Sequence, residues 1–514
     1  MENRKPAITP SLRKVSFRKK GWIEPVSIFP TLATTDGFVW LDSSLNDPRY
    51  GRWSYMMSHP FTTLSGAGNV FHLNDGGKET VHEGDPLTLL DDMFRRYQVE
   101  TVGAKMPPFT GGAVGFFGYG LLRFTEPSAQ IARGIRITSE GDLWMGFYDR
   151  VLAFDHERKE IWLIANHEHE TDPSPILNEL ERTVEEAVQR GGGLLSKPFL
   201  PLTKGEWREA PRGFNSTDSE SSLIRRGSGI QPDADMPKQR ELKLECPFTK
   251  ESYVDALEKV RLYIERGDIL QANISRAIMS HGKFDPVSLY LKLREINPAP
   301  FAAYLNAGTF RILSSSPERF MRFKNGEAQT RPIKGTRPRG RDADDDDRLR
   351  HELATSDKDI AENVMIVDLM RNDLSKVCQP FTVNVPELCA VERFATVFHL
   401  TSTVEGKLKP GLTPVDLIRA SFPPGSVTGA PKLRALEIID EVEPDPRGAY
   451  CGSIGWIGFD GSMDTSVAIR MMVHTDDGVR LHSGGGVTYP SRPEDEYDET
   501  SVKASALLEA LLKS

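Results

Sequence analysis

Lys334 is the side chain in this 514-residue sequence with the clearest potential for chemistry. It lies in RPIKGTRPRG, residues 331–340, where four basic side chains alternate with prolines and glycines. Three hypotheses fit this stretch: a basic patch for an acidic partner, a phosphate loop, or a reactive amine. A lysine reacts as a free amine only if its pKa is lowered, and burial or neighbouring cations such as Arg331 and Arg337 would lower it.

Glu362 is the first of several carboxylates that could bind a cation. It falls in 357–374, a segment with apolar residues on nearly every face, which predicts a buried helix. A buried carboxylate must be paired, protonated or bound to a metal. A salt bridge, for example to Arg371, is the simpler interpretation.

The last predicted helix, from about Pro493, carries a second acidic group. Glu496, Glu499 and Lys503 follow one another at i, i+3 and i+7, so they share one face. This face is either solvated, with a Glu499–Lys503 pair, or it joins Glu362 around a hard cation. Magnesium typically takes one or two protein carboxylates and leaves positions for substrate oxygens.

Three further stretches carry candidate functional groups. Glu318 follows Pro317 at a strand or turn edge, where it is either a general acid or base or an ordinary surface residue. SGGGVT, residues 483–488, presents consecutive backbone N–H groups that could bind an anion, with a tight turn as the alternative. PPGSVTGAPK fails the Walker pattern because Pro431 stands where a glycine should precede Lys432.

The elements that must position these groups are helices mixed with hairpins. Helical spacing of apolar residues predicts a helix over 249–267, which Thr249 can cap and Gly267 can end. The next stretch, 268–280, alternates like a strand whose polar face carries Gln271, Asn273 and Ser275. Further strands are predicted at 37–43, 301–308, 310–323, 448–459, 463–474 and 478–488, with hairpin turns at 155–160 and at Asn325–Gly326.

These elements lack a strict βαβ alternation, which favours an α+β fold with large antiparallel sheets. We divide the chain into a first unit at 1–190, a flexible linker or insert at 191–240 that is rich in Gly, Ser and Pro, and a second unit at 241–514. The basic segment 1–22 lacks the apolar region of a secretory signal. We interpret it as a solvated arm, with organellar targeting as the alternative.

Composition excludes several classes of function. A net charge of −9 disfavours nucleic acid as the main ligand, and no apolar run approaches the length of a membrane span, about 18 residues. The four cysteines form no CxxC pair, so neither a disulfide framework nor a zinc site is predicted. A cytoplasmic protein is expected. The cysteines are Cys246, Cys378, Cys389 and Cys451.

The motifs SSSPERF, RPIKGTRPRG, ENVMIVDLMRNDL, FPPGSVTGAPK, YCGSIGW, AIR, SGGG and DEYDETSVKA occur in this order. As an ordered set they resemble the chorismate-utilising enzymes, which include anthranilate synthase component I, aminodeoxychorismate synthase component I and the isochorismate and salicylate synthases. The resemblance is strong over 245–510 and looser in the amino-terminal half, through GRWSYM and PPFTGGAVGFFGYG. It implies a sandwich of antiparallel sheets with helices outside, formed by two intertwined subdomains around one active-site cleft.

The resemblance also implies roles for the matching residues. Glu362 and Glu499 correspond to ligands of Mg²⁺, the expected cofactor, with Glu496 nearby. Glu318 corresponds to the general acid that protonates the departing carbon-4 hydroxyl, and His399 to an active-site histidine. The residues implied to contact chorismate are Gly335, Thr336, Tyr450, Arg470, Gly484, Gly485, Gly486 and Lys503.

Two positions divide the family by reaction. Gln271 stands where the members that add water resemble one another in carrying a lysine base, so ammonia is the expected nucleophile. Lys334 matches the PIKGT of aminodeoxychorismate synthases, whereas anthranilate synthases have PIAGT. In the implied mechanism the lysine amine attacks carbon 2 and expels the carbon-4 hydroxyl, and ammonia then attacks carbon 4 and expels the lysine. The expected product is 4-amino-4-deoxychorismate, with anthranilate as the alternative and a non-catalytic relative as a further one.

The resemblance implies partners as well as substrates. No glutamine amidotransferase module is recognisable, so we expect ammonia from a separate amidotransferase, component II, and pyruvate elimination to 4-aminobenzoate by another enzyme. Neither nucleic acid nor a membrane is an expected partner. The family's tryptophan-binding motif, approximately LLES, reads LDSS here, and its last residue, Ser44, marks a candidate tryptophan pocket.

Overall fold

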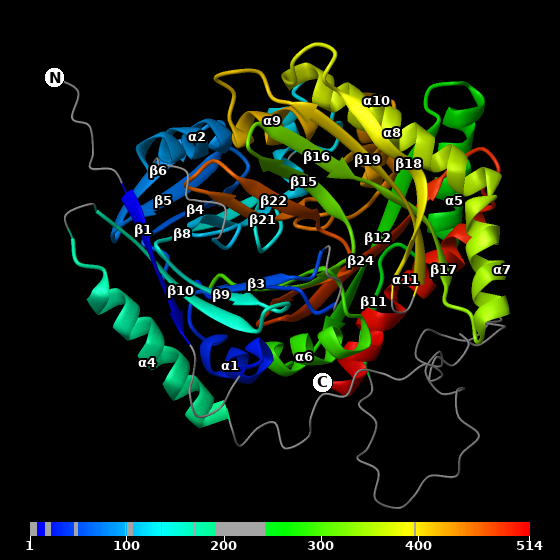
Figure 1. Cartoon of the computed structure of the whole chain (residues 1–514). Coiled ribbons are helices and arrows are strands. Elements are labelled where there is room, and N and C mark those ends of the chain that lie inside the picture. Colours follow the sequence, from blue (N-terminus) through cyan, green and yellow to red (C-terminus); the bar gives the residue numbers. More distant parts are fainter. Residues whose placement is uncertain are drawn as a thin grey trace, which may run out of the picture.

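A computed structural model describes residues 8–15, 22–45, 50–97, 99, 106–134, 136–168, 171–191, 242–394 and 397–514. The predicted linker therefore lies almost wholly outside the described residues. The described strands form two antiparallel sheets of twelve strands each, stacked face to face (Figure 1). The predicted α+β fold with large antiparallel sheets is confirmed.

The two sheets are named A and B. In spatial order, sheet A contains β1 (Ile8–Val15), β10 (Glu160–Glu168), β9 (Arg150–Asp155), β3 (Trp53–Met57), β2 (Val39–Asp42), β13 (Phe301–Asn306), β14 (Arg311–Ser316), β23 (Met471–Thr475), β24 (Gly478–Val487), β12 (Gln271–His281) and β11 (Lys243–Glu245), with β20 (Gly429–Ala430) paired to β12. Sheet B contains β17 (Ile333–Pro338), β19 (Val397–Lys407), β16 (Glu327–Arg331), β15 (Arg319–Lys324), β22 (Met463–Val467), β21 (Ser453–Gly458), β7 (Gly112–Phe117), β8 (Leu143–Tyr148), β4 (Thr62–Ala67), β5 (Val70–Asp75) and β6 (Lys78–Glu83), with β18 (Asn384–Arg393) paired to β19.

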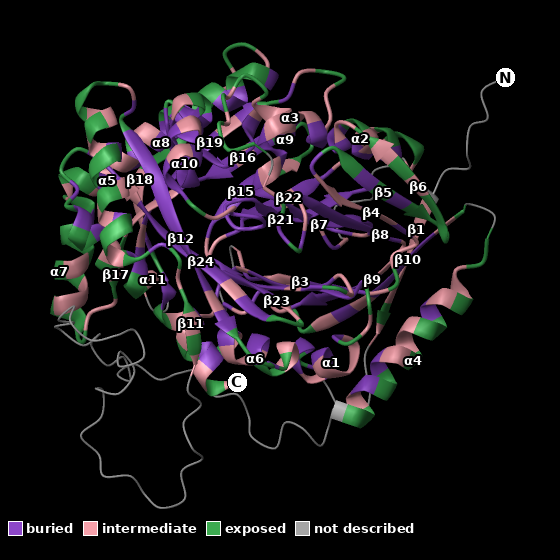
Figure 2. Ribbon diagram, turned by 180° about the vertical axis from the view of Figure 1, so that it is seen from behind, coloured by how far each residue is buried: buried purple, intermediate pink, exposed green. Residues whose placement is uncertain are grey.

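Helices cover the outer faces of both sheets (Figure 1). Below sheet A lie α1 (Pro25–Leu32), α4 (Ser174–Gly191), α6 (Pro286–Ile296) and α11 (Pro493–Lys513). Above sheet B lie α2 (Pro86–Arg96), α8 (Asp357–Val377) and α9 (Pro414–Ser421), with the short α3 (Leu122–Thr125) beside α9 in Figure 2. The remaining helices are α5 (Lys250–Glu265), α7 (Ala343–Ala354), α10 (Lys432–Val442) and the short 3₁₀ helices η1 (Tyr119–Leu121) and η3 (Gly425–Val427).

The largest apolar core fills the space between the sheets, where most side chains are buried (Figure 2). It joins Val114 and Phe116 of sheet B to Ala303 and Leu305 of sheet A. A second core lies under sheet A and packs α1, α6 and α11 against it. Apolar area removed from water is the main force that holds such layers together.

Both sheets contain strands from both halves of the chain. In sheet A, β2 pairs with β13, and in sheet B, β7 pairs with β21. The predicted intertwining is therefore confirmed, while the predicted domain boundaries stay a prediction. The hairpin turns at 155–160 and at Asn325–Gly326 are also confirmed, and Asn325 and Gly326 have the positive φ angles, 53° and 81°, that this turn requires.

Two predicted strands are each split between the sheets, so these predictions were wrong. Residues 310–323 form β14 in sheet A and β15 in sheet B, and residues 463–474 form β22 in sheet B and β23 in sheet A. The breaks fall at Pro317–Glu318 and at Ala468–Arg470. Proline cannot donate to a ladder, and Arg470 has a φ of 53°, which no regular strand accommodates.

The basic amino-terminal segment is not wholly a solvated arm. Residues 8–15 form β1, which pairs with β10 along its whole length, so that prediction was wrong for this part. The structure describes no helix that is both long and apolar enough to cross a membrane. All four cysteines are free, as expected.

Gly115 tests the close packing of β7 against its neighbours. A Cβ atom there would lie 1.9 Å from the carbonyl oxygen of Trp144. We expect Gly115→Ala to lower the free energy of unfolding by about 2–3 kcal/mol, because the backbones must move apart. Ala113→Gly, on the same strand, is the control and should cost at most about 1 kcal/mol. Urea unfolding measures both, and an equal effect would contradict the close approach.

Candidate active site

The amine of Lys334 is the point on which the predicted site residues converge. Lys334 lies on β17, and its Nζ donates a hydrogen bond to the carbonyl of Ser426, 3.2 Å away. Burial lowers the pKa of Lys334, opposed by the charges of Glu362 and Glu318 and reinforced by Lys503. The same amine is therefore within electrostatic reach of α8, α11 and the β14–β15 connection.

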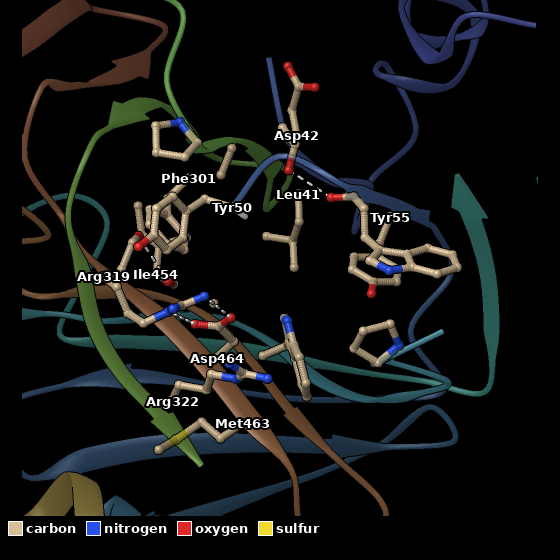
Figure 3. Close-up of a pocket in the computed structure, with 18 of the residues that line it drawn as sticks. Leu41, Asp42, Tyr50, Tyr55, Phe301, Arg319, Arg322, Ile454, Met463 and Asp464 are labelled. Atoms are coloured by element: carbon tan, nitrogen blue, oxygen red, sulfur yellow. Dashed lines mark hydrogen bonds and ion pairs between the residues drawn. The ribbon is translucent and has the colours of Figure 1, made fainter. Parts of the chain in front are cut away.

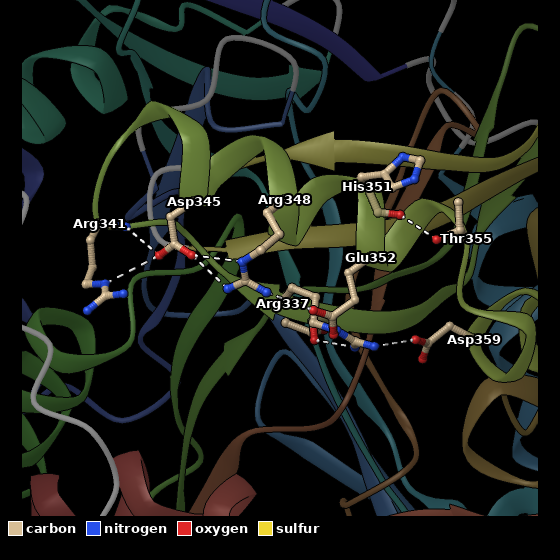
Figure 4. A network of polar contacts seen from close by, with 9 residues as sticks. Arg337, Arg341, Asp345, Arg348, His351, Glu352, Thr355 and Asp359 are labelled. Carbon is tan, nitrogen blue, oxygen red and sulfur yellow. Dashed lines mark hydrogen bonds and ion pairs between the residues drawn. The ribbon is translucent and has the colours of Figure 1, made fainter.

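Arg331 and Arg337 do not cause this shift, so that prediction was wrong. Arg337 lies between Glu352 and Asp359, at 2.8 and 3.1 Å, and Arg331 pairs with Glu392 at 2.9 Å. Figure 4 shows the Arg337 contacts and the neighbouring network in which Asp345 binds Arg341 and Arg348. The basic residues of RPIKGTRPRG are thus neutralised within the protein, which argues against a basic patch for an acidic partner.

Gly335 creates a bulge beside the lysine. Lys334 pairs with Leu400 of β19 and Thr336 pairs with His399, so Gly335 is the extra residue. Its φ is 74°, and a Cβ there would lie 2.8 Å from Leu353 and 2.9 Å from Asp359. The bulge therefore shifts the pairing of β17 with β19 by one residue directly after Lys334.

Glu318 is buried, with 4% of its surface exposed, so the interpretation as a surface residue was wrong. It occupies the break between β14 and β15. Burial raises the pKa of Glu318 to about 7, although the nearby Ser426 hydroxyl and Lys334 act in the opposite direction. Its Oε1 has no hydrogen-bond partner among the described residues. A carboxyl group of this pKa is substantially protonated at neutral pH and can donate a proton.

His399 lies on β19 opposite Thr336. Its Nδ1 is 2.9 Å from the Thr336 hydroxyl, and burial lowers its pKa to about 4, with Arg470 acting in the same direction. The ring is therefore neutral at physiological pH. A neutral imidazole can accept or donate a hydrogen bond but supplies no positive charge for a carboxylate.

The SGGG segment belongs to the strand predicted over 478–488, so the tight-turn alternative was wrong, whereas anion binding by its backbone stays a prediction. Gly484, Gly485 and Gly486 belong to β24 and pair with β12. On the other edge, the pairing of β24 with β23 ends at Leu481, so the backbone beyond it is open. The carbonyl of Gly484 accepts a hydrogen bond from Lys503 Nζ at 3.0 Å.

The glycines leave room for other groups. A Cβ on Gly485 would lie 3.0 Å from Glu496 Oε2, and one on Gly486 would lie 2.6 Å from Gln271 Nε2 and 3.7 Å from Lys334 Nζ. Gln271 is fully buried, and neither its Oε1 nor its Nε2 finds a partner in the described part of the chain. Buried amides are rarely left unsatisfied, so this side chain indicates a place for a ligand. The polar face of β12 lines the site instead of facing solvent.

The carboxylates of α8 and α11 also meet here. Lys358 Nζ lies 4.0 Å from Glu362 Oε1 and 3.7 Å from Glu496 Oε1. The predicted Glu499–Lys503 pair is confirmed at 2.6 Å. The salt bridge expected for Glu362 is therefore made with Lys358 and not with Arg371, the example given, because Arg371 binds Asp368. The predicted burial of α8 on every face was also wrong, because Val364 is 42% exposed.

These carboxylates suit magnesium in their chemistry. Within the described ranges no three or more His, Cys, Asp or Glu side chains form a ready metal cluster. Magnesium needs only one or two carboxylates, and Glu362 Oε1 is buried without a hydrogen-bond partner in the described structure. Burial raises the pKa of Glu362 and of Glu496. A neighbouring acid raises each pKa further, Asp359 that of Glu362 and Glu499 that of Glu496. A divalent cation would offset both the burial of these charges and their mutual repulsion, so the residues fit the ion.

Tyr450 and Arg470 complete the candidate substrate contacts. The Tyr450 ring stacks on His482, with centroids 5.1 Å apart. Arg470 donates to the carbonyl of Lys503 and makes no ion pair with any described carboxylate. Burial lowers the pKa of Arg470, although the group stays cationic. An arginine without an acidic partner is suited to an anionic ligand.

Sequence reasoning missed two residues that contact this set. Ser426 supplies the carbonyl that binds Lys334, and Lys358 bridges the acids of two helices. Ser426 was visible within FPPGSVTGAPK, although nothing in that stretch indicated that its backbone, and not a phosphate loop, mattered. Lys358 precedes Glu362 by one helical turn, and that spacing was the available signal.

A separate cavity of about 260 Å³ lies between the sheets near Ser44 (Figure 3). Leu41, Asp42 and Ser43 line it, whereas the Ser44 hydroxyl binds the backbone of Ala299 outside the lining. The Asp42 Oδ1 has no partner among the described residues. The tryptophan pocket therefore stays a prediction, with these three neighbours as its lining.

Comparison with known proteins matches residues 45–509 to the family described as chorismate binding enzyme. The chain is 36% identical to aminodeoxychorismate synthase component 1 of Escherichia coli (strain K12), over 92% of this chain and 93% of that protein. It is 32% identical to anthranilate synthase component 1 of Acetivibrio thermocellus, over 95% and 92%. The crystal structure of anthranilate synthase component I from Streptococcus pneumoniae TIGR4 superposes with a TM-score of 0.69 at 29% identity, covering 90% of this chain and 93% of that chain.

Replacing Glu362 tests the cation site without any catalytic assay. We expect Glu362→Gln to weaken Mg²⁺ binding by about tenfold or more, because a charged ligand is lost. In metal-free protein the thermal midpoint should stay the same or rise, since the variant removes a largely buried charge whose only described ion pair, with Lys358 at 4.0 Å, is long. Isothermal titration with Mg²⁺ and thermal unfolding in EDTA measure the two effects. Glu352→Gln, outside the site, is the matched control, and equal Mg²⁺ affinities for both variants would contradict the assignment.

Proposed function

The chain belongs to the chorismate binding enzyme family, and on that premise we propose that it converts chorismate and ammonia into 4-amino-4-deoxychorismate and water. The observation that carries this proposal is the position of Lys334. Its amine, with a lowered pKa, lies beside the open strand edge at Gly486 and within electrostatic reach of Glu318 and Glu362. A lysine in this place can react with a ring carbon before ammonia does.

The first proposed step joins Lys334 to the substrate. The free amine attacks carbon 2 of chorismate, the ring double bonds shift, and the carbon-4 hydroxyl leaves as water with a proton from Glu318. The pKa of about 7 suits Glu318 to this role, because an acid catalyst is most effective when its pKa is near the working pH. The amine nitrogen then passes its extra proton to the Glu318 carboxylate, which restores the acid, and remains bonded to carbon 2.

The second step exchanges the lysine for ammonia. Ammonia attacks carbon 4, the double bonds shift back, and the carbon 2–nitrogen bond breaks. The new carbon-4 ammonium loses one proton and the departing lysine nitrogen gains one, which gives the product amine and restores the Lys334 amine. Attack by ammonia at carbon 2 instead would lead to anthranilate, so the lysine decides which carbon receives nitrogen. Gln271 cannot deprotonate water, and this supports ammonia over water as the final nucleophile.

Substrate binding is proposed to divide between side chains and backbone. Arg470, Lys503 and the open edge of β24 receive the carboxylates, Tyr450 and the Gly335–Thr336 bulge contact the rest of the molecule, and neutral His399 supplies a hydrogen bond. Glu362 and Glu499, with Glu496 nearby, would hold Mg²⁺. When bound, Mg²⁺ neutralises a substrate carboxylate and fixes its position.

The ammonia is proposed to come from a separate glutamine amidotransferase. The relatives named component 1 support this, since the name implies a second component. We also propose that the enzyme works in the cytoplasm, which the four free cysteines support. A further enzyme would then eliminate pyruvate to give 4-aminobenzoate, for folate or another product.

Incubation with chorismate, Mg²⁺ and ammonium tests the proposal. We expect 4-amino-4-deoxychorismate, separated by chromatography and converted to 4-aminobenzoate only after a lyase is added. Lys334→Ala should reduce amination at carbon 4 by about 100-fold or more, since the nucleophile is lost. Lys292→Ala, on the exposed side of α6, is the control and should retain full activity. Anthranilate fluorescence without any lyase would contradict the proposal and favour the anthranilate synthase alternative.

The pH dependence follows from the pKa of Glu318. The general acid must carry its proton, so kcat/KM for chorismate should fall as the pH rises through about 7. Glu318→Gln should lower kcat/KM by about 100-fold or more and lose this alkaline limb. A profile measured with saturating Mg²⁺ and constant free ammonia checks this. An unchanged limb in the variant would assign it to another group.

A further inference from the structure

A buried ion pair outside the predicted site holds the turn that binds the Lys334 amine. The turn is η3, whose Ser426 carbonyl accepts the hydrogen bond from Lys334. The next residue, Val427, offers its carbonyl to Arg447 Nη1 at 2.9 Å. Arg447 Nη2 reaches the carbonyl of Asn273 at 2.6 Å. One guanidinium therefore joins η3 to strand β12.

Glu443 fixes that guanidinium in place. Its two oxygens accept from Arg447 Nε at 2.9 Å and Nη2 at 2.6 Å, a bidentate geometry that sets the plane of the arginine. Glu443 Oε1 also accepts from the backbone N–H of Ser275 at 2.7 Å. The side chains of Arg447 and Glu443 are only 2% and 4% exposed. The ring of Tyr119 packs 4.7 Å from the guanidinium carbon.

The two elements joined by Arg447, η3 and β12, lie on two sides of the Lys334 amine. On one side, Val427 directly follows Ser426, so it fixes the carbonyl that Lys334 binds. On the other side, Asn273 lies two residues after Gln271 on the same face of β12, and it pairs with Gly486. A Cβ on Gly486 would lie 3.7 Å from the Lys334 amine. A change in the distance between η3 and β12 must therefore move the amine's acceptor relative to the substrate space.

Stability alone does not explain such a pair. Burying two charges costs several kcal/mol for each ion before their attraction is counted, and apolar residues of similar volume often serve equally well. The backbone N–H of Asn273 also binds the carbonyl of Thr428 at 2.7 Å, so the guanidinium acts beside a direct backbone contact between β12 and the end of η3. What the arginine supplies, and an apolar side chain cannot, is a fixed separation between two backbone oxygens.

We propose that Arg447, oriented by Glu443, is a positioning residue that holds the Ser426 carbonyl and strand β12 at the separation that aims the Lys334 amine at the substrate. This inference rests on the proposed function, in which that amine is the nucleophile. Arg447 makes no contact with the described catalytic side chains, and it acts through the turn.

The test separates positioning from stability with a double variant. Arg447→Met alone leaves the Glu443 charge buried and unpaired, so the thermal midpoint should fall sharply. Arg447→Met combined with Glu443→Leu removes both charges and should recover most of that loss. We expect kcat for carbon-4 amination to stay about 30-fold or more below that of the unmodified protein, with KM for chorismate changed by no more than about threefold.

A matched pair elsewhere provides the control. Arg123 and Asp142 lie 3.1 Å apart, are largely buried, and Asp142 also accepts a backbone N–H, from Gly68. Arg123→Met combined with Asp142→Leu should retain kcat within about twofold, because this pair holds no part of the site. If the Arg447 and Glu443 double variant regained kcat together with its thermal midpoint, the pair would be merely structural.

A single conservative variant covers the case in which the double variant does not fold. Arg447→Lys keeps the charge opposite Glu443, but one ammonium cannot hold both carbonyls in the arginine's geometry. It should fold and lose kcat by about tenfold with little change in KM. Unchanged kcat, or a rise in KM alone, would overturn the inference. The product made by the unmodified protein and the effect of Lys334→Ala test the proposed function without any change at Arg447. Failure of the proposed function is therefore distinguishable from failure of the positioning role of Arg447.

Discussion

The β14–β15 and β22–β23 connections pass side by side from one sheet to the other, and the hydrogen bonds between them fix where a site can form. Ser315 donates through its N–H and its hydroxyl to the carbonyl of Arg470, at 3.0 and 3.1 Å. Ser316 donates its hydroxyl to Val467 at 2.6 Å, and the N–H of Val467 reaches the carbonyl of Glu318 at 3.0 Å. Each segment leaves its sheet at this crossing. Glu318 and Arg470 occupy the breaks, so the topology places both the proposed proton donor and the proposed carboxylate-binding cation.

Burial acts on the two central groups in opposite senses. It raises the pKa of the Glu318 carboxyl and lowers that of the Lys334 amine, because both charged forms lose their water. The proposed first step needs a protonated acid and a free amine, and the surroundings of both favour those forms. The carboxylates on α8 and α11 limit how far the lysine pKa falls. A bound cation would weaken that opposing field, so metal binding and amine reactivity are coupled in this account.

Much of the fold could be predicted from sequence, and its failures share a cause. The antiparallel sheets, the Asn325–Gly326 hairpin and the capped helix α5 depend on local periodicity and turn chemistry, which a sequence displays. The splitting of 310–323 and 463–474 between two sheets depends on partners far along the chain, which periodicity does not reveal. The strand over 478–488 was predicted, but the contacts that its glycines allow with Glu496 and Gln271 depend on the same distant partners.

The site divides in the same way. Ordered motifs placed Lys334, Glu318, Glu362 and the acids of α11 in one set, and the structure brings them together. Burial was correctly predicted to lower the lysine pKa, but the predicted contribution of Arg331 and Arg337 was wrong, since acids from other elements neutralise both arginines. Arg447 and Glu443 gave no signal, because their role depends on backbone carbonyls, which every residue has. Sequence patterns cannot indicate which backbone carbonyls a buried arginine will bind.

The central claim is that the Lys334 amine bonds to the substrate, and mass spectrometry tests it most directly. The protein would be mixed with chorismate and Mg²⁺ without ammonia, quenched in acid and digested. The account predicts that the peptide containing Lys334 gains the mass of chorismate less one water, and that added ammonia discharges this adduct as 4-amino-4-deoxychorismate. An unmodified Lys334 peptide, at substrate concentrations that support turnover once ammonia is supplied, would contradict it.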